Sequence, residues 1–195
     1  MKKISITVIC IFIALSVIFT VFFGSKYSNT KENVTLQDPP SLTVICANES
    51  IDATRITTSW HYKNADGTFS GINADSPHPL ELKDSMSYII LKPTPYSSIN
   101  PLTAYLSWET APDKVYVRSW SEEHWGNTDA SGENIDITVT SDGLHYINLH
   151  EDNCVYEVVA EWSSSAEYGG TVYYCFYTQN SLIFNFDVNE LKPIN

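Results

Sequence analysis

The sequence lacks the short motifs that mark the common enzyme classes. It contains no H-E-x-x-H, no G-x-S-x-G, no G-x-x-x-x-G-K-[ST] and no G-x-G-x-x-G pattern. One S-x-x-K occurs at residues 28–31, in a polar stretch where no packed core would desolvate the lysine. The absences argue against zinc peptidases, serine hydrolases and nucleotide-binding enzymes. We therefore predict no catalytic residue and no cofactor.

Basic residues are scarce. The chain has 11 Lys and Arg against 23 Asp and Glu, a formal net charge of −12, and Lys2, Lys3, Lys26 and Lys31 all precede residue 33. The rest of the chain is therefore even more acidic than the total suggests. Such a surface repels nucleic acid and anionic lipid, so we expect no nucleic-acid partner. An acidic surface is also an ordinary soluble surface, and it identifies no ligand by itself.

Cysteine is rare, and its number beyond the first 23 residues is odd. Cys46, Cys154 and Cys175 lie there, so at least one thiol stays free. Strand alternation places Cys154 and Cys175 on opposite faces of their sheet, which makes Cys46–Cys154 the more plausible bridge. Three free and buried thiols are the favoured alternative.

Residues 4–23 contain no charge, and they follow Lys2 and Lys3. Twenty residues of helix span about 30 Å, the thickness of the hydrocarbon core of a bilayer. The two lysines favour a cytoplasmic N-terminus, so the remainder is expected outside the cell. We expect residues 1–3 in the cytoplasm, a signal anchor at 4–23, a flexible stalk at 24–40 and an extracellular domain at 41–195. A cleaved signal peptide, which would make the protein secreted, stays open.

Helical periodicity is missing after residue 23. Short runs rich in Val, Ile, Thr, Tyr and Trp recur instead, separated by turn residues. They predict an all-β domain, an antiparallel two-sheet sandwich of the immunoglobulin-like kind behind a single N-terminal transmembrane helix. The expected strands are 41–48, 55–62, 68–73, 86–92, 103–109, 114–120, 135–140, 144–149, 154–162, 171–178 and 182–188.

The clearest alternation is in residues 154–162. Here Tyr156, Val158, Ala160 and Trp162 are expected inward, and Glu157 and Glu161 outward. Aromatic residues in the other strands are expected to complete the core. The expected core residues are Trp60, Trp108, Trp120, Tyr156, Val158 and Trp162.

Candidate binding residues lie in polar loops. Asn127, Asp129 and Ser131 match the first ligand positions of a Ca²⁺ loop, but Thr138 stands where a bidentate Glu is needed. They form only a weak calcium candidate, and we predict no resident metal. Trp125 lies in the same acidic loop and is expected to be partly exposed, and His78 lies between two prolines in an extended loop. These two residues are the speculative ligand-binding residues.

Seven phrases of the sequence are distinctive: SWHY at 59–62, NADG at 64–67, ADSPHPL at 74–80, VRSW at 117–120, EHWGN at 123–127, VYEVVAEW at 155–162 and YGGTVYY at 168–174. Together they resemble an extracytoplasmic domain of unknown function from clostridial Gram-positive bacteria. The same domain is also seen at the extracellular end of membrane metallopeptidases similar to β-lactam sensors. The resemblance implies a location in the cell envelope and a sensing or binding role, but it brings no catalytic residue because the zinc motif is absent.

These observations predict a non-catalytic, membrane-anchored extracellular module that binds or senses an unidentified ligand. Its expected contacts are the membrane, through residues 4–23, and an extracellular ligand or membrane-protein partner. The alternatives are an interaction subunit that recognises a partner through a sheet edge, and a cell-surface enzyme that uses the acidic, histidine-containing loops.

Overall fold

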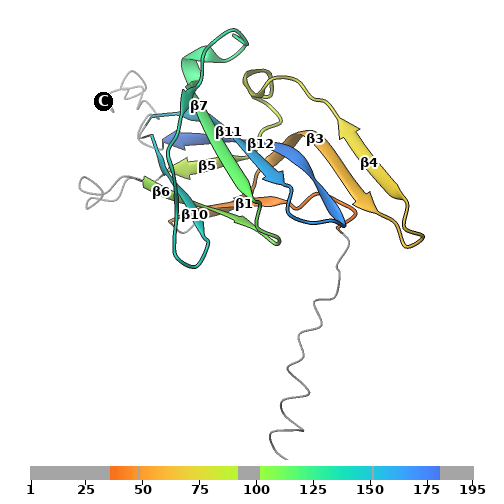
Figure 1. Cartoon of the computed structure of the whole chain (residues 1–195). Coiled ribbons are helices and arrows are strands. Elements are labelled where there is room, and N and C mark those ends of the chain that lie inside the picture. The colour runs from red at the N-terminus through yellow and green to blue at the C-terminus, as the bar shows by residue number, and fades with distance from the viewer. Residues whose placement is uncertain (1–35, 48, 92–101, 151, 181–195) are drawn as a thin grey trace, which may run out of the picture. The chain divides into compact units, whose positions relative to one another are not determined.

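Strands make up nearly all of the regular structure, as the alternation of apolar residues predicts. The computed structural model describes residues 36–47, 49–91, 102–150 and 152–180 (Figure 1). The expected membrane segment at 4–23 and the expected strand at 182–188 lie outside these residues. In the described part, no helix has the length and apolarity needed to cross a membrane.

The described strands agree with most of the expected ones and add two short polar strands, β2 and β8. The elements are β1 (Leu42–Cys46), β2 (Glu49–Asp52), β3 (Thr54–Lys63), β4 (Phe69–Ala74), the 3₁₀ turn η2 (Pro79–Glu81), β5 (Tyr88–Leu91), β6 (Leu102–Trp108), β7 (Lys114–Ser121), the 3₁₀ turn η4 (Glu122–His124), β8 (Glu133–Asn134), β9 (Ile137–Val139), β10 (His145–Leu149), β11 (Cys154–Trp162) and β12 (Tyr168–Asn180).

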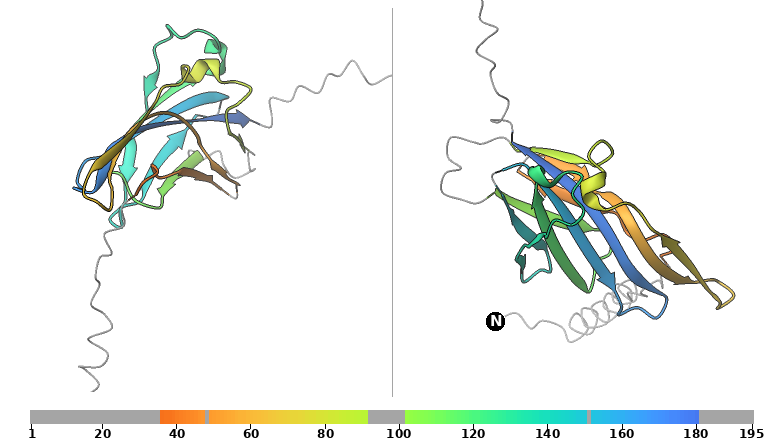
Figure 2. Two further views of the ribbon diagram at one scale, coloured as in Figure 1. Left: turned by 90° about the vertical axis from the view of Figure 1, so that its right-hand side faces the viewer. Right: turned by 90° about the horizontal axis from the view of Figure 1, so that it is seen from above.

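The strands form two sheets, as predicted for a sandwich (Figures 1 and 2). One sheet has five strands in the order β2-β1-β6-β10-β9, and the other has seven, with β4-β3-β12-β11-β7-β8 as its main path. The remaining strand, β5, pairs with the end of β12 and runs parallel to it. The expectation of purely antiparallel sheets is therefore wrong at β5. Its pairing begins at Tyr177, beyond Cys175 where β3 stops pairing with β12, so β5 continues the edge that β3 leaves open.

The main core contains the predicted inward face of β11. Tyr156, Val158 and Ala160 are fully buried and Trp162 is 4% exposed. The Tyr156 ring stacks on Phe176 of β12, with the ring centroids 4.9 Å apart. Of the aromatic core residues expected from the sequence, Trp60 and Trp120 are also buried, and Trp108 packs against the core while partly exposed.

The outer face of the seven-stranded sheet is covered as well, which the sequence analysis missed. The turn η2 and the loop after η4 fold over this face of the sheet (Figure 2), and a second apolar cluster forms beneath them. The Gly126 amide of the loop donates to the Leu80 carbonyl of η2 at 2.9 Å. Glu157 was expected to point outward into solvent. This expectation is wrong, because the covered residue is only 4% exposed. Glu161, four residues along, is partly exposed as expected. The buried members of this second cluster are Ile56, Leu80, Met86, Trp120, Val155 and Cys175.

The folded domain begins earlier than the expected boundary at residue 41. Pro39 and Pro40 are buried, and Leu36 packs against the main core. The Trp60 indole Nε1 donates to the Leu36 carbonyl at 3.0 Å, and Arg55 donates to the Pro39 carbonyl at 3.1 Å. Residues 36–40 therefore belong to the sandwich, because their backbone carbonyls satisfy side chains of the seven-stranded sheet.

Candidate functional site

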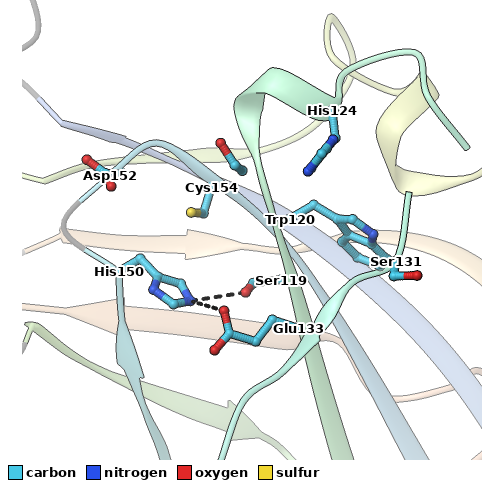
Figure 3. Close-up of a pocket in the computed structure, with 9 residues that line it drawn as sticks. Ser119, Trp120, His124, Ser131, Glu133, His150, Asp152 and Cys154 are labelled. Atoms are coloured by element: carbon cyan, nitrogen blue, oxygen red, sulfur yellow. Dashed lines mark hydrogen bonds and ion pairs between the residues drawn. The ribbon is translucent and has the colours of Figure 1, made fainter. Parts of the chain in front are cut away.

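A pocket of about 300 Å³ opens at one end of the sandwich, where β7 ends and β11 begins (Figure 3). The register pairs Ser121 with Cys154, so these two strand ends lie side by side. The loop after η4 and the short β8 form one wall, and the turn between β10 and β11 forms the other. The lining residues are Ser119, Trp120, Ser121, His124, Ser131, Glu133, His150, Asp152 and Cys154.

Three of these residues form a polar cluster in the pocket. Ser119 Oγ lies 3.2 Å from His150 Nε2, and Glu133 Oε2 lies 3.8 Å from the same nitrogen (Figure 3). Pairing of β7 with β8 places Glu133 next to Ser119. The Tyr156 hydroxyl accepts a hydrogen bond from the His150 amide at 2.8 Å, and the two rings stack with centroids 6.3 Å apart. The histidine is therefore fixed from its backbone and from its ring.

The cluster resembles a hydrolase triad in composition but differs from one in geometry. A triad histidine takes the proton of the serine on one ring nitrogen while the acid holds the other nitrogen. Here both partners face Nε2 of His150, so the carboxylate cannot orient the ring for proton transfer from Ser119. Ser119 is also only 3% exposed. The arrangement is better suited to holding a polar ligand than to nucleophilic attack.

Carboxylates dominate the charge of the pocket. Glu133 and Asp152 line it, and no Lys or Arg is among its nine lining residues. Glu122 is also close enough that its charge acts with those of Asp152 and Glu133 on the Cys154 thiol. The pocket is therefore electronegative, and two histidines and three serines add hydrogen-bonding groups.

The three cysteines of the described region are free and buried, which was the favoured reading of the sequence. Cys46 and Cys154 belong to the main core and Cys175 to the second cluster, so the predicted opposite orientation of Cys154 and Cys175 is confirmed. Burial raises the pKa of Cys154 to about 11, with the nearby carboxylates adding to the effect, and burial raises that of Cys175 to about 12. The reactive species of cysteine is the thiolate, so Cys154 is an inert pocket wall and not a nucleophile.

We expect these thiols to resist chemical modification in the folded protein. In a Cys10→Ser background, Cys46, Cys154 and Cys175 should fail to react with a disulfide reagent at pH 8 and should all react in guanidinium chloride. A raised thiol pKa stabilises the folded state below the unfolded pKa, and this contribution declines as the pH rises above about 9. Rapid reaction of Cys154 at pH 8 without denaturant would contradict its burial and raised pKa.

The two speculative binding residues lie outside the pocket. Trp125 is half-buried and covers the second cluster, 5.5 Å from the Tyr177 ring, with the Lys83 ammonium 5.8 Å from its own ring. The imidazole of His78 caps η2 by accepting from the Leu80 amide at 3.2 Å, and it packs edge-on against Trp120 at 5.4 Å. In this structure both residues support the loops that carry one wall of the pocket.

The weak calcium candidate is exposed. Asn127, Asp129 and Ser131 all lie on the surface of the loop, and only Ser131 reaches the pocket. Across the described ranges, no group of three or more His, Cys, Asp or Glu side chains is placed to hold a metal ion. Gly132, the glycine of the calcium pattern, has a packing role: a Cβ there would lie 2.7 Å from Cε2 of Trp120.

The sequence did not predict the pocket residues because they come together from positions far apart in the chain. Ser119 lies on β7 and Glu133 on β8 of one sheet, and His150 directly follows β10 of the other, and none belongs to a recognisable spacing. The only signals were His150 beside two acidic residues and the acidic composition of the loop at 121–136.

Comparison with known proteins adds no assignment: the chain matches no protein-family model, and neither the curated proteins nor the solved structures give a significant match.

Proposed function

We propose that this protein is a non-catalytic, membrane-anchored module whose extracellular sandwich binds a small ligand carrying an ammonium group. The observation that carries the proposal is the pocket at the end of the sandwich, which combines two carboxylates with hydroxyl and imidazole groups and has no Lys or Arg in its lining. Concave sites with a few convergent polar groups are the usual form of small-ligand sites. Carboxylates select a cation through Coulomb attraction and charge-assisted hydrogen bonds.

The anchoring part of the proposal rests on the sequence. The charge-free run at 4–23 behind Lys2 and Lys3 favours a single-pass anchor with the domain outside the cell, and a cleaved signal would give a secreted form instead. The resemblance to extracytoplasmic domains of clostridial Gram-positive bacteria agrees with this location. An immunoglobulin-like role, in which loops at one end of a sandwich hold the ligand, agrees with the position of the pocket.

The alternatives have weaker support. A surface enzyme would need an activated nucleophile, and the shared Nε2 contacts of Ser119 and Glu133 together with the raised pKa of Cys154 argue against one. An interaction subunit would use a sheet edge, and β4 is an uncharged edge strand with Phe69 59% exposed. A pocket with convergent polar groups favours the binding module over that subunit.

Calorimetric titration of the full-length protein in non-ionic detergent with 1,5-diaminopentane tests the proposal. Pentane-1,5-diol is the matched uncharged probe. We expect the diamine to bind and the diol not to bind, and we expect the affinity to fall as salt is added.

Two double variants locate the binding. Glu133→Gln with Asp152→Asn should weaken diamine binding by about tenfold, because two exposed charge contacts of up to roughly 1 kcal/mol each are lost together. Glu123→Gln with Asp129→Asn removes the same charge from the same region outside the acidic lining, and it should change the affinity less than about twofold. Equal losses in both variants, equal binding of the diol, or no binding of the diamine would overturn the proposal.

A further inference from the structure

The outer face of the five-stranded sheet carries a continuous row of side chains across all five strands. The register aligns Ser50 with Ile45, Ile45 with Tyr105, Tyr105 with Tyr146, and Tyr146 with Thr138. Their strand neighbours Val44, Cys46, Ala104, Leu106 and Ile147 are buried on the opposite face. The row therefore faces away from the core.

Two tyrosines form the centre of this row. Tyr105 is 45% exposed, and its ring centroid lies 6.0 Å from that of the partly exposed Tyr146. Ile45, on the neighbouring strand, is 37% exposed. Three large side chains on adjacent strands thus make an exposed platform that the folding of this domain does not require, because none of them belongs to either buried cluster.

The platform is nearly free of charge in a strongly acidic protein. The alternating positions on this face around the row are Thr43, Asp52, Thr103, Ser107 and Asn148. Among the residues that the five described strands place on this face, Asp52 is the sole carboxylate, and its Oδ1 accepts a hydrogen bond from Thr43 Oγ1 at 2.9 Å. Thr103 Oγ1 lies 3.4 Å from Asn148 Oδ1. The remaining polar groups are hydroxyls and an amide, which exchange hydrogen bonds with hydroxyl-rich ligands.

We propose that this face is a second binding surface, independent of the pocket, for an uncharged β-linked polysaccharide. The apolar faces of successive sugar rings would lie on Tyr105 and Tyr146, and ring hydroxyls would bond to the surrounding Thr, Ser and Asn side chains. An open sheet face accepts a flat, extended chain along its surface. The lack of charge on the platform matches a neutral polymer, whereas the net charge of −12 repels anionic ones.

A second copy of the chain is a poorer occupant of the same face. Stable homodimer interfaces are markedly apolar at their centre, and this face offers one aliphatic residue and two tyrosines among hydroxyl groups. Two acidic domains would also repel one another on approach.

Co-sedimentation of the full-length protein in non-ionic detergent with chitin and with microcrystalline cellulose tests the inference, with polygalacturonate gel as the anionic comparison. We expect retention on at least one neutral polymer and none on the anionic gel. Tyr105→Ala and Tyr146→Ala should each reduce the apparent affinity by about tenfold, the loss expected when a stacking contact disappears.

Tyr116→Ala is the matched control, because Tyr116 is a 51% exposed strand tyrosine on the other sheet, and it should leave retention unchanged. Tyr105→Thr keeps a strand-forming residue with a hydroxyl, so it separates loss of the ring from loss of folding. The inference fails if no neutral polymer retains the protein or if folded Tyr105→Thr binds as the parent does. It also fails if Tyr105→Ala changes how the protein sediments alone and leaves its retention on the polymer unchanged. Failure of diamine binding in the pocket would leave this result unaffected.

Discussion

Replacing Trp162 with alanine is expected to lower the free energy of unfolding by about 3–5 kcal/mol, the usual cost of truncating a buried tryptophan. Trp162 is 4% exposed and meets the Trp60 ring edge-on, with the centroids 5.5 Å apart. Its indole Nε1 donates to the Thr110 carbonyl at 3.1 Å. The substitution would remove a large contact area from the main core and leave that carbonyl without its donor.

Urea denaturation followed by far-UV circular dichroism measures this cost without depending on tryptophan fluorescence. Trp125→Ala is the control, because Trp125 is half-buried at the periphery of the second cluster. It should cost clearly less than Trp162→Ala. A cost under about 1 kcal/mol for Trp162→Ala would mean that the inward face of β11 is assigned wrongly.

Arg118→Met is expected to destabilise the domain by about 2–3 kcal/mol, because it leaves a buried carboxylate without its partner. The Glu157 side chain is 5% exposed, and its Oε2 accepts from both Nε and Nη2 of Arg118, the former at 3.1 Å. The guanidinium also lies over the Trp120 ring at 5.4 Å. The Arg118 side chain is 47% exposed, so we expect a loss of stability at the lower end of the range for breaking a buried ion pair.

A double-mutant cycle isolates the pair. Arg118→Met with Glu157→Gln should recover much of the loss, since no buried charge then remains. Lys114→Met supplies the matched control on the same two strands: its ammonium lies 3.5 Å from Glu161, and the two side chains are 59% and 32% exposed. That variant should cost less than about 1 kcal/mol. Equal losses of stability in Arg118→Met and Lys114→Met would show that the buried Arg118–Glu157 pair contributes no more than an exposed pair.

The sequence predicted those features that local alternation determines. The inward face of β11, the opposite orientation of Cys154 and Cys175, and the two-sheet architecture all follow from a side-chain period of two. Strand ends shifted by one or two residues, as at β4 and β5, because the last residues of a strand are fixed by pairing partners rather than by their own pattern.

Features that depend on long-range coverage were not predictable. Glu157 reads as outward from its own strand, and it is buried because η2 and the loop after η4 fold over that face. The polar strand β2 forms because Ala47, with φ at +52°, turns the chain back so that Glu49 pairs with Cys46. No apolar pattern marks such a strand.

The candidate site was the least predictable part. Trp125 and His78 were predicted to bind a ligand because each stands out in its own loop. In the structure both pack against other aromatic rings and support loops beside the pocket. The pocket itself arises where Ser119 of β7 lies next to Glu133 of β8 and to His150, the residue after β10. Convergence of that kind depends on the register between strands, which a single sequence does not reveal.

The most direct test of the binding proposal is an amide-resonance titration of the isotope-labelled full-length protein with 1,5-diaminopentane. The account predicts saturable shifts concentrated at Ser119–Ser121, Glu133 and residues 150–154, with none at Tyr105 or Tyr146 and none anywhere on titration with pentane-1,5-diol. Shifts spread evenly over the acidic surface, or the same shifts with the diol, would contradict the claim that this pocket is a specific site for an ammonium group.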